Sequence, residues 1–115
     1  MAHISLSRLE QMFRDMKTEA GWNPDGELLW GYFFVDEDPE KLRLLAGKLQ
    51  QEGYQLVGIS PTDGAPSFRL HVERVETHSP RSLDRRNQEL ETLASRSSVE
   101  AYDGMEVGPV SGRAQ

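Results

Sequence analysis

Few side chains in this chain have the types and spacing that catalysis requires. Four carboxylates cluster at Asp36, Glu37, Asp38 and Glu40. Paired carboxylates act as acid and base where an apolar site separates their pKa values. These four, however, come directly before a predicted helix, where negative charge stabilises the N-terminal end of the helix dipole. The run therefore favours helix capping over acid–base chemistry.

The histidines do not form a metal-binding pattern either. His71 and Glu73 are two residues apart on a predicted strand, so their side chains share one face. A protein metal site needs more ligands converging on one point, and we interpret the pair as a solvated strand face. The sequence also lacks a nucleophile elbow, a phosphate-binding glycine loop and a dinucleotide fingerprint. We expect no catalytic residue, no metal and no cofactor.

An aromatic surface is a third candidate. Trp30, Tyr32 and Phe34 alternate along one face of a predicted strand, and exposed aromatic rings can stack on RNA bases. The net charge of −6 and the pI near 5 oppose binding to a polyanion and would steer a basic protein toward the chain instead. We expect a protein partner and no direct contact with nucleic acid.

Hydrophobic periodicity predicts the elements that position these residues. We expect helices over residues 5–20, 39–52 and 80–96, and strands over residues 28–35, 54–60, 67–75 and 99–107. After the first helix the order is βαββαβ, the pattern of an α+β ferredoxin-like antiparallel sheet. The first strand is apolar on both faces, as central strands are. Two helices would cover one face, and the extra N-terminal helix would cover Trp30, Tyr32 and Phe34 on the other.

Asn87 is the unusual residue of the third predicted helix. It lies on the apolar stripe of that helix, between Leu83 and Leu90, and a buried amide needs a hydrogen-bonding partner. We expect that partner to be irregular backbone near residues 102–104 or in the second connection. A structural role between helix and strand is favoured, and a ligand or partner contact is the alternative.

The C-terminal half resembles the family of the ribonuclease E inhibitor RraB. The resemblance covers residues 27–107 and rests on the order of strands and helices, on the inward Asn87, and on one short motif. The segment Tyr102-Asp103-Gly104-Met105-Glu106 is similar to the Tyr-Asp-Gly-Trp-Glu signature near the C-terminus of that family. Met105 stands where the family usually has tryptophan, and methionine can fill similar apolar space.

The resemblance implies a non-catalytic regulator that binds ribonuclease E outside its active site and alters RNA decay. An acidic domain would bind basic, disordered segments of such an enzyme through charge and shape. We expect Asp36, Glu37, Asp38 and Glu40 to form part of the contact region. The alternatives are a generic interaction module, such as an immunity or antitoxin-type partner protein, and a small-molecule sensor domain.

The length of 115 residues indicates one domain. We assign residues 1–108 to it, with residues 1–26 as its N-terminal helix and turn, and residues 109–115 to a flexible tail. The chain has no cysteine, no signal-peptide pattern and no apolar run of the ~20 residues that span a bilayer. These features predict a cytoplasmic protein that does not associate with membranes. They do not predict its oligomeric state.

Overall fold

The computed structural model describes residues 5–20, 23, 26–63 and 66–109. The helices are α1 (Leu6–Asp15), continued by a π-helical turn η1 (Met16–Ala20), α2 (Pro39–Gln51) and α3 (Pro80–Arg96). The strands are β1 (Leu28–Asp36), β2 (Gln55–Pro61), β3 (Phe68–Glu76) and β4 (Ala101–Pro109). Each element begins and ends within two residues of its predicted bounds. The turn predicted after the first helix lies partly outside the described residues, and the predicted tail does so from residue 110 onward.

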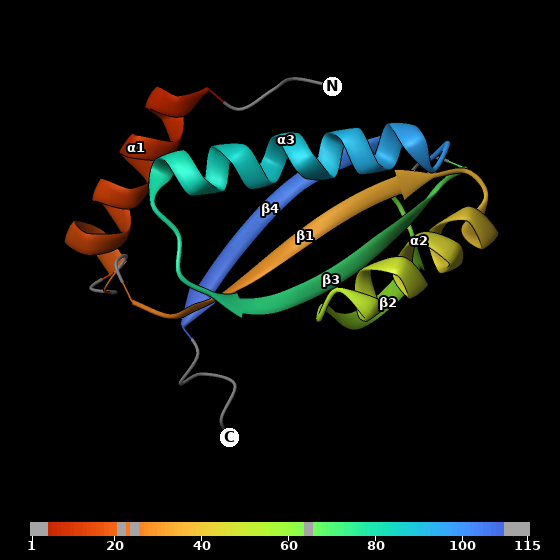
Figure 1. Ribbon diagram of the computed structural model, residues 1–115, viewed down its shortest axis with the longest axis horizontal. Coiled ribbons are helices and arrows are strands. Elements are labelled where there is room, and N and C mark those ends of the chain that lie inside the picture. The colour runs from red at the N-terminus through yellow and green to blue at the C-terminus, as the bar shows by residue number, and fades with distance from the viewer. Residues whose placement is uncertain (1–4, 21–22, 24–25, 64–65, 110–115) are drawn as a thin grey trace.

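The strands form one antiparallel sheet in the order β2-β3-β1-β4 (Figure 1). β1 and β3 are the central strands, as the apolar character of β1 on both faces predicts. β1 pairs with β3 from Leu28 to Asp36 without interruption, whereas its pairing with β4 shifts by one residue between Phe33 and Phe34. That shift is a β-bulge in β4.

All three helices cover the same face of the sheet. The prediction that the N-terminal helix covers the opposite face is wrong, because α1 lies beside α3 (Figure 1). Phe13 of α1 stacks on Trp30, with ring centroids 6.0 Å apart, and both are buried. On the opposite face, Arg69 and His71 pack against the ring of Phe33, so side chains of the sheet itself already cover part of the apolar surface there. Burying an aromatic ring is worth roughly 1.5–3 kcal/mol, so α1 packs where it can cover Trp30.

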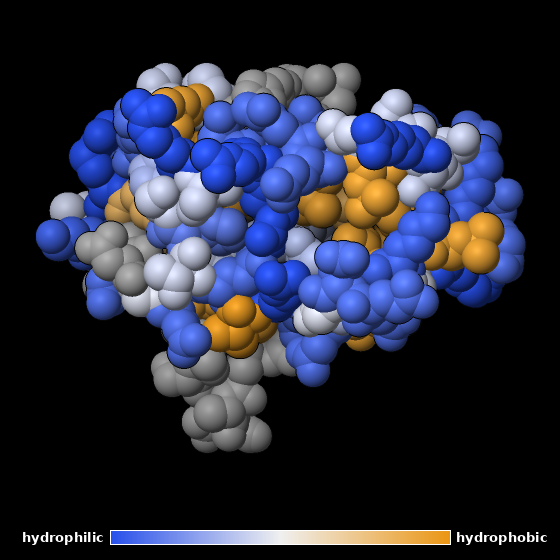
Figure 2. All heavy atoms as spheres, viewed as in Figure 1, coloured by the Kyte–Doolittle hydropathy of each residue, from blue (hydrophilic) through white to orange (hydrophobic). Residues whose placement is uncertain are grey.

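Polar residues define the starts of the helices. The Ser5 side chain accepts a hydrogen bond from the backbone of α1, and Asp38 does the same for α2, which begins with a proline. Ser79 and Ser82 form a reciprocal capping box at the start of α3. The helix face of the molecule is mainly hydrophilic outside, with small apolar patches between α3 and α2 (Figure 2). None of the described helices is long and apolar enough to cross a membrane.

Candidate functional site

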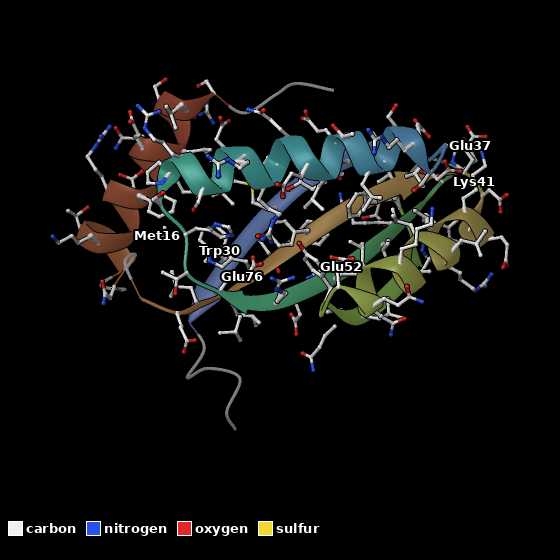
Figure 3. The ribbon with its side chains drawn as sticks, in the orientation of Figure 1. Met16, Trp30, Glu37, Lys41, Glu52 and Glu76 are labelled. Atoms are coloured by element: carbon white, nitrogen blue, oxygen red, sulfur yellow. The ribbon has the colours of Figure 1, made fainter. Side chains whose placement is uncertain are left out.

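The predicted acidic run lies at the end of the sheet where β1 passes into α2. Figure 3 shows Glu37 there, next to Lys41 and at the opposite end of the molecule from Met16. The side chains of Glu37, Asp38 and Glu40 are exposed, and so is that of Glu100. We call these four residues the acidic corner. Three of them line part of a shallow hollow, which is formed by Asp36, Glu37, Asp38, Pro39, Lys41, Ser98 and Glu100.

Asp36 does not belong to this exposed surface. It is only 5% exposed, and its two carboxylate oxygens accept hydrogen bonds from the backbone N–H groups of Asp38, at 2.7 Å, and Glu100, at 2.8 Å. It therefore fastens the end of β1 to the start of α2 and to the segment before β4. The expectation that Asp36 contacts a partner is wrong, because its oxygens are already used inside the domain.

Within the acidic corner, the side chains of Asp38 and Glu40 make only weak contacts inside the domain. Asp38 caps α2 by accepting from the backbone N–H of Glu40 at 2.9 Å. Glu40 forms an ion pair with Arg43 at 2.6 Å, but both side chains are more than half exposed. Exposed pairs of this kind contribute less than about 1 kcal/mol. The corner can therefore exchange its internal partner for an incoming cationic group at little cost.

The candidate aromatic surface is absent from the outside of the molecule. Trp30, Tyr32 and Phe34 are all fully buried, and each ring meets another beneath the helices. Trp30 meets Phe13, Tyr32 meets Tyr54, and Phe34 meets Tyr102. The prediction of an aromatic binding surface is wrong, because the face that carries these rings is the one that all three helices cover.

Asn87 connects α3 to β4, as the sequence indicates. It is 2% exposed, and its Oδ1 accepts a hydrogen bond of 2.5 Å from the hydroxyl of Tyr102. Tyr102 is also buried, and burial raises the pKa of its phenol. The partner of Asn87 thus lies in the expected segment but is a side chain, where irregular backbone was expected. The first residue of the family motif fixes the long helix to the edge strand.

The next two motif residues form the bulge of β4. Tyr102 pairs with Phe34 and Gly104 with Phe33, so Asp103 is the extra residue. Gly104 has a φ of +108°, a backbone conformation that residues other than glycine rarely adopt. The carboxylate of Asp103 accepts from Arg69 of β3 at 2.9 Å on the outer face of the sheet. Tyr102 and Asp103 therefore contact groups on opposite faces, as consecutive residues of a strand do.

Glu106, the last motif residue, also lies on the outer face. Its Oε2 is 3.7 Å from Nε2 of His71, whose ring lies over Gly31. A Cβ atom at Gly31 would come within 2.8 Å of that nitrogen, so the histidine occupies the space that glycine leaves open. The described residues contain no group of three or more His, Cys, Asp or Glu arranged to hold a metal ion.

A buried carboxylate at Glu76 organises a polar cluster that our sequence reasoning missed. Oε1 accepts from the hydroxyl of Tyr32 at 2.6 Å and lies 3.0 Å from Nε2 of His78. Oε2 accepts a hydrogen bond from Arg86 of α3 and forms an ion pair with Nε of Arg74 at 3.1 Å. Figure 3 places Glu76 close to Trp30 under α3. The alternation that begins with Leu70 and Val72 puts residue 76 on the inner face, and this alternation could have predicted that Glu76 is buried.

The electrostatics of this cluster indicate a structural role. Burial alone would raise the pKa of Glu76, but hydrogen bonds from His78, Tyr32 and Arg86, together with the charge of Arg86, outweigh it and lower the pKa to about 2. A carboxylate with this pKa stays ionised near neutral pH and has no proton to donate. Both of its oxygens are occupied, so the arrangement holds α3 on the sheet and leaves no base directed at a substrate.

Comparison with known families gives one match of nearly full length. The family model described as "Regulator of ribonuclease activity B" (RraB) matches residues 8–107. That range contains β1, β2, β3, α2 and α3, and most of α1 and β4. None of the curated proteins matches the sequence.

Proposed function

Since the chain belongs to the RraB family of regulators of ribonuclease activity, we propose that it binds ribonuclease E and modulates RNA decay without catalysing a reaction. The observation that carries this proposal is the family match over residues 8–107. The match includes the sheet and its helices, so it concerns the whole described domain. We further infer a ferredoxin-like fold, which the central positions of β1 and β3 support, and action in the cytoplasm.

We place the first contact at the acidic corner. Its exposed carboxylates and the net charge of −6 favour a cationic partner, because complementary charge accelerates encounter and orients the two molecules. The partner would be a basic, extended segment of the ribonuclease, of the kind that also binds RNA. Occupying such a segment would compete with RNA for the same positive charges.

A charge variant of the corner tests this placement. The variant combines Glu37→Lys, Asp38→Asn and Glu40→Lys, in which asparagine retains the cap of α2. We expect its affinity for immobilised ribonuclease E, measured by surface plasmon resonance, to fall at least about tenfold, roughly 1.4 kcal/mol. The difference should shrink as salt is raised, because the Debye length falls to about 3 Å at 1 M.

A matched control changes the net charge equally elsewhere. It combines Glu10→Lys and Asp15→Asn on α1 with Glu89→Lys on α3; Glu10 and Glu89 are exposed, and Asp15 is half-buried. We expect this variant to bind within about twofold of the wild type at 0.15 M salt, since distant charges are screened there. Equal losses in both variants would indicate a general charge effect and would exclude a specific contact at the corner.

A further inference from the structure

The outer edge of β2 is less protected than the other edge of the sheet. β2 pairs with β3 on one side, and no strand of the described residues pairs with its other side. An unpaired edge exposes backbone N–H and C=O groups, so edge strands usually carry charged residues that prevent unwanted pairing. β4, at the opposite edge, carries Asp103 and Glu106, whereas β2 contains no charged residue.

Two apolar side chains accompany this unpaired backbone. Leu56 is 43% exposed and Val57 is 51% exposed, which places both among the most exposed large apolar residues of the described chain. Val57 is the extra residue of a bulge, because Leu56 and Gly58 pair with neighbouring residues of β3. Strand addition combines such elements: the backbone edge supplies affinity, and the adjacent side chains supply specificity.

The charges around β2 indicate which strand fits. Glu52 precedes β2 and Asp63 follows it, and both are exposed. A second copy of the chain, paired antiparallel edge to edge, would bring each Glu52 near the Asp63 of the other copy, and like charges at short range oppose pairing. A segment with basic residues at both ends would instead place a cation near each carboxylate.

The same edge leads toward the acidic corner. Pro61 at the end of β2 pairs with Phe68, and Phe68 pairs with Asp36. These three residues form one row across the sheet, so Pro61 lies two strand spacings, about 10 Å, from Asp36. A strand added to β2 would lie one spacing farther, roughly 14 Å from Asp36, and its continuation would leave the sheet at the end of the molecule where Figure 3 shows Glu37.

We propose that the edge of β2 binds an extended segment of a basic partner as a fifth strand. The segment has apolar side chains at alternate positions, which contact Leu56 and Val57, and basic residues at its ends, which meet Glu52 and Asp63. Residues 55–60 span about 20 Å, so roughly six residues pair between the basic ends. The inference rests on the proposed function for the identity of this partner, and it adds the site and the mode of binding.

A synthetic peptide tests the site directly. The probe is a fluorescein-labelled peptide with two lysines at each end and alternating valine and threonine between them. We expect Val57→Lys to weaken its binding, measured by fluorescence anisotropy, at least about tenfold, because lysine protects an edge. Leu44→Lys is the matched control; Leu44 is 65% exposed on α2, and this variant should bind within about twofold of the wild type. Equal binding by Val57→Lys and wild type would overturn the proposal.

Hydrogen exchange and a second peptide complete the test. The amides of residues 55–60 should gain protection when the peptide binds, and protection confined to other strands or helices would contradict strand addition. A peptide with glutamate in place of lysine should bind at least about tenfold more weakly; equal affinity would overturn the assigned charge preference. Val57→Thr serves as a milder variant that keeps a β-branched side chain, with the same direction of effect expected.

Ribonuclease E separates this inference from the proposed function. If the wild type binds ribonuclease E and Val57→Lys binds it equally well, the edge site is wrong while the regulatory function stands. If the wild type binds the peptide along β2 but does not bind ribonuclease E, the edge site stands and the regulatory function is wrong.

Discussion

Replacing Glu76 with glutamine is expected to destabilise the fold in a strongly pH-dependent way. The pKa of Glu76 is lowered from 4.5 to about 2 in the folded protein. A difference of one pKa unit corresponds to ~1.4 kcal/mol, so ionised Glu76 contributes about 3 kcal/mol to the free energy of unfolding. Because the folded pKa lies below the unfolded one, this contribution is fully present above about pH 4.5 and is lost as the pH falls toward 2.

The assay is urea unfolding at a series of pH values, followed by tryptophan fluorescence. Trp30 is a suitable reporter because its ring lies edge-on to His78 in the same cluster, at 5.3 Å. At pH 7 the Glu76→Gln variant should lose about 3 kcal/mol, since Arg86 and Arg74 keep their charges without their buried carboxylate. The difference between wild type and variant should shrink steadily below pH 4.5.

Glu89→Gln is the control for this experiment. Glu89 also pairs with Arg86, at 3.5 Å, but its side chain is 61% exposed, so its loss should cost less than about 1 kcal/mol. Two results would refute the reasoning. One is an unchanged free energy of unfolding for Glu76→Gln at pH 7, and the other is a loss that does not diminish on acidification.

Three further substitutions test the structural roles of site residues, with stability measured by urea unfolding in each. Tyr102→Phe leaves Oδ1 of Asn87 without its donor and should cost about 1–3 kcal/mol; a neutral result would mean that this hydrogen bond does not fasten α3. Gly104→Ala forces a side chain into a φ of +108° and should cost about 1–3 kcal/mol, and no loss would contradict the bulge geometry. Asp36→Asn replaces one of two accepting oxygens with a donor and should cost about 1–3 kcal/mol. Its control, Glu37→Gln, should change stability by less than about 0.5 kcal/mol. Similar losses in both variants would contradict the distinction between the buried and the exposed carboxylate.

Local patterns predicted the secondary structure closely because each element carries its own signals. The proline at the start of α2 follows a capping Asp38, and Ser79 caps α3 in the same way. The double-sided apolar character of β1 correctly predicted its central position. The role of Asn87 followed from its place on an apolar stripe, because a buried amide restricts the choice of neighbours.

Long-range arrangement was harder to predict. An apolar stripe on α1 indicates that the helix is buried on one side, but it does not indicate which face of the sheet receives it. The face on which α1 packs depends on where Trp30 stays uncovered by the other helices. That in turn depends on the position of α3, which local sequence does not indicate. Asp36 was misassigned for a similar reason, since its second partner, the backbone of Glu100, is 64 residues away in the sequence.

The cluster around Glu76 shows the same limit for buried charge. A glutamate at the end of a strand is usually solvated, and only the convergence of Arg86, Arg74 and His78 in space makes burial favourable. The edge of β2 differs from the Glu76 cluster, because the sequence alone shows that β2 contains no charged residue. Its position at the edge of the sheet had to come from the topology.

Cleavage of an RNA substrate by purified ribonuclease E, with and without this protein, is the most direct test of the proposed regulation. We expect the wild type to bind the ribonuclease and to slow cleavage in proportion to the fraction bound. The acidic-corner variant should be at least about tenfold less potent, and the matched charge control should be as potent as the wild type. Unchanged cleavage at protein concentrations well above that of the ribonuclease, together with no detectable binding, would show that the protein does not regulate ribonuclease E.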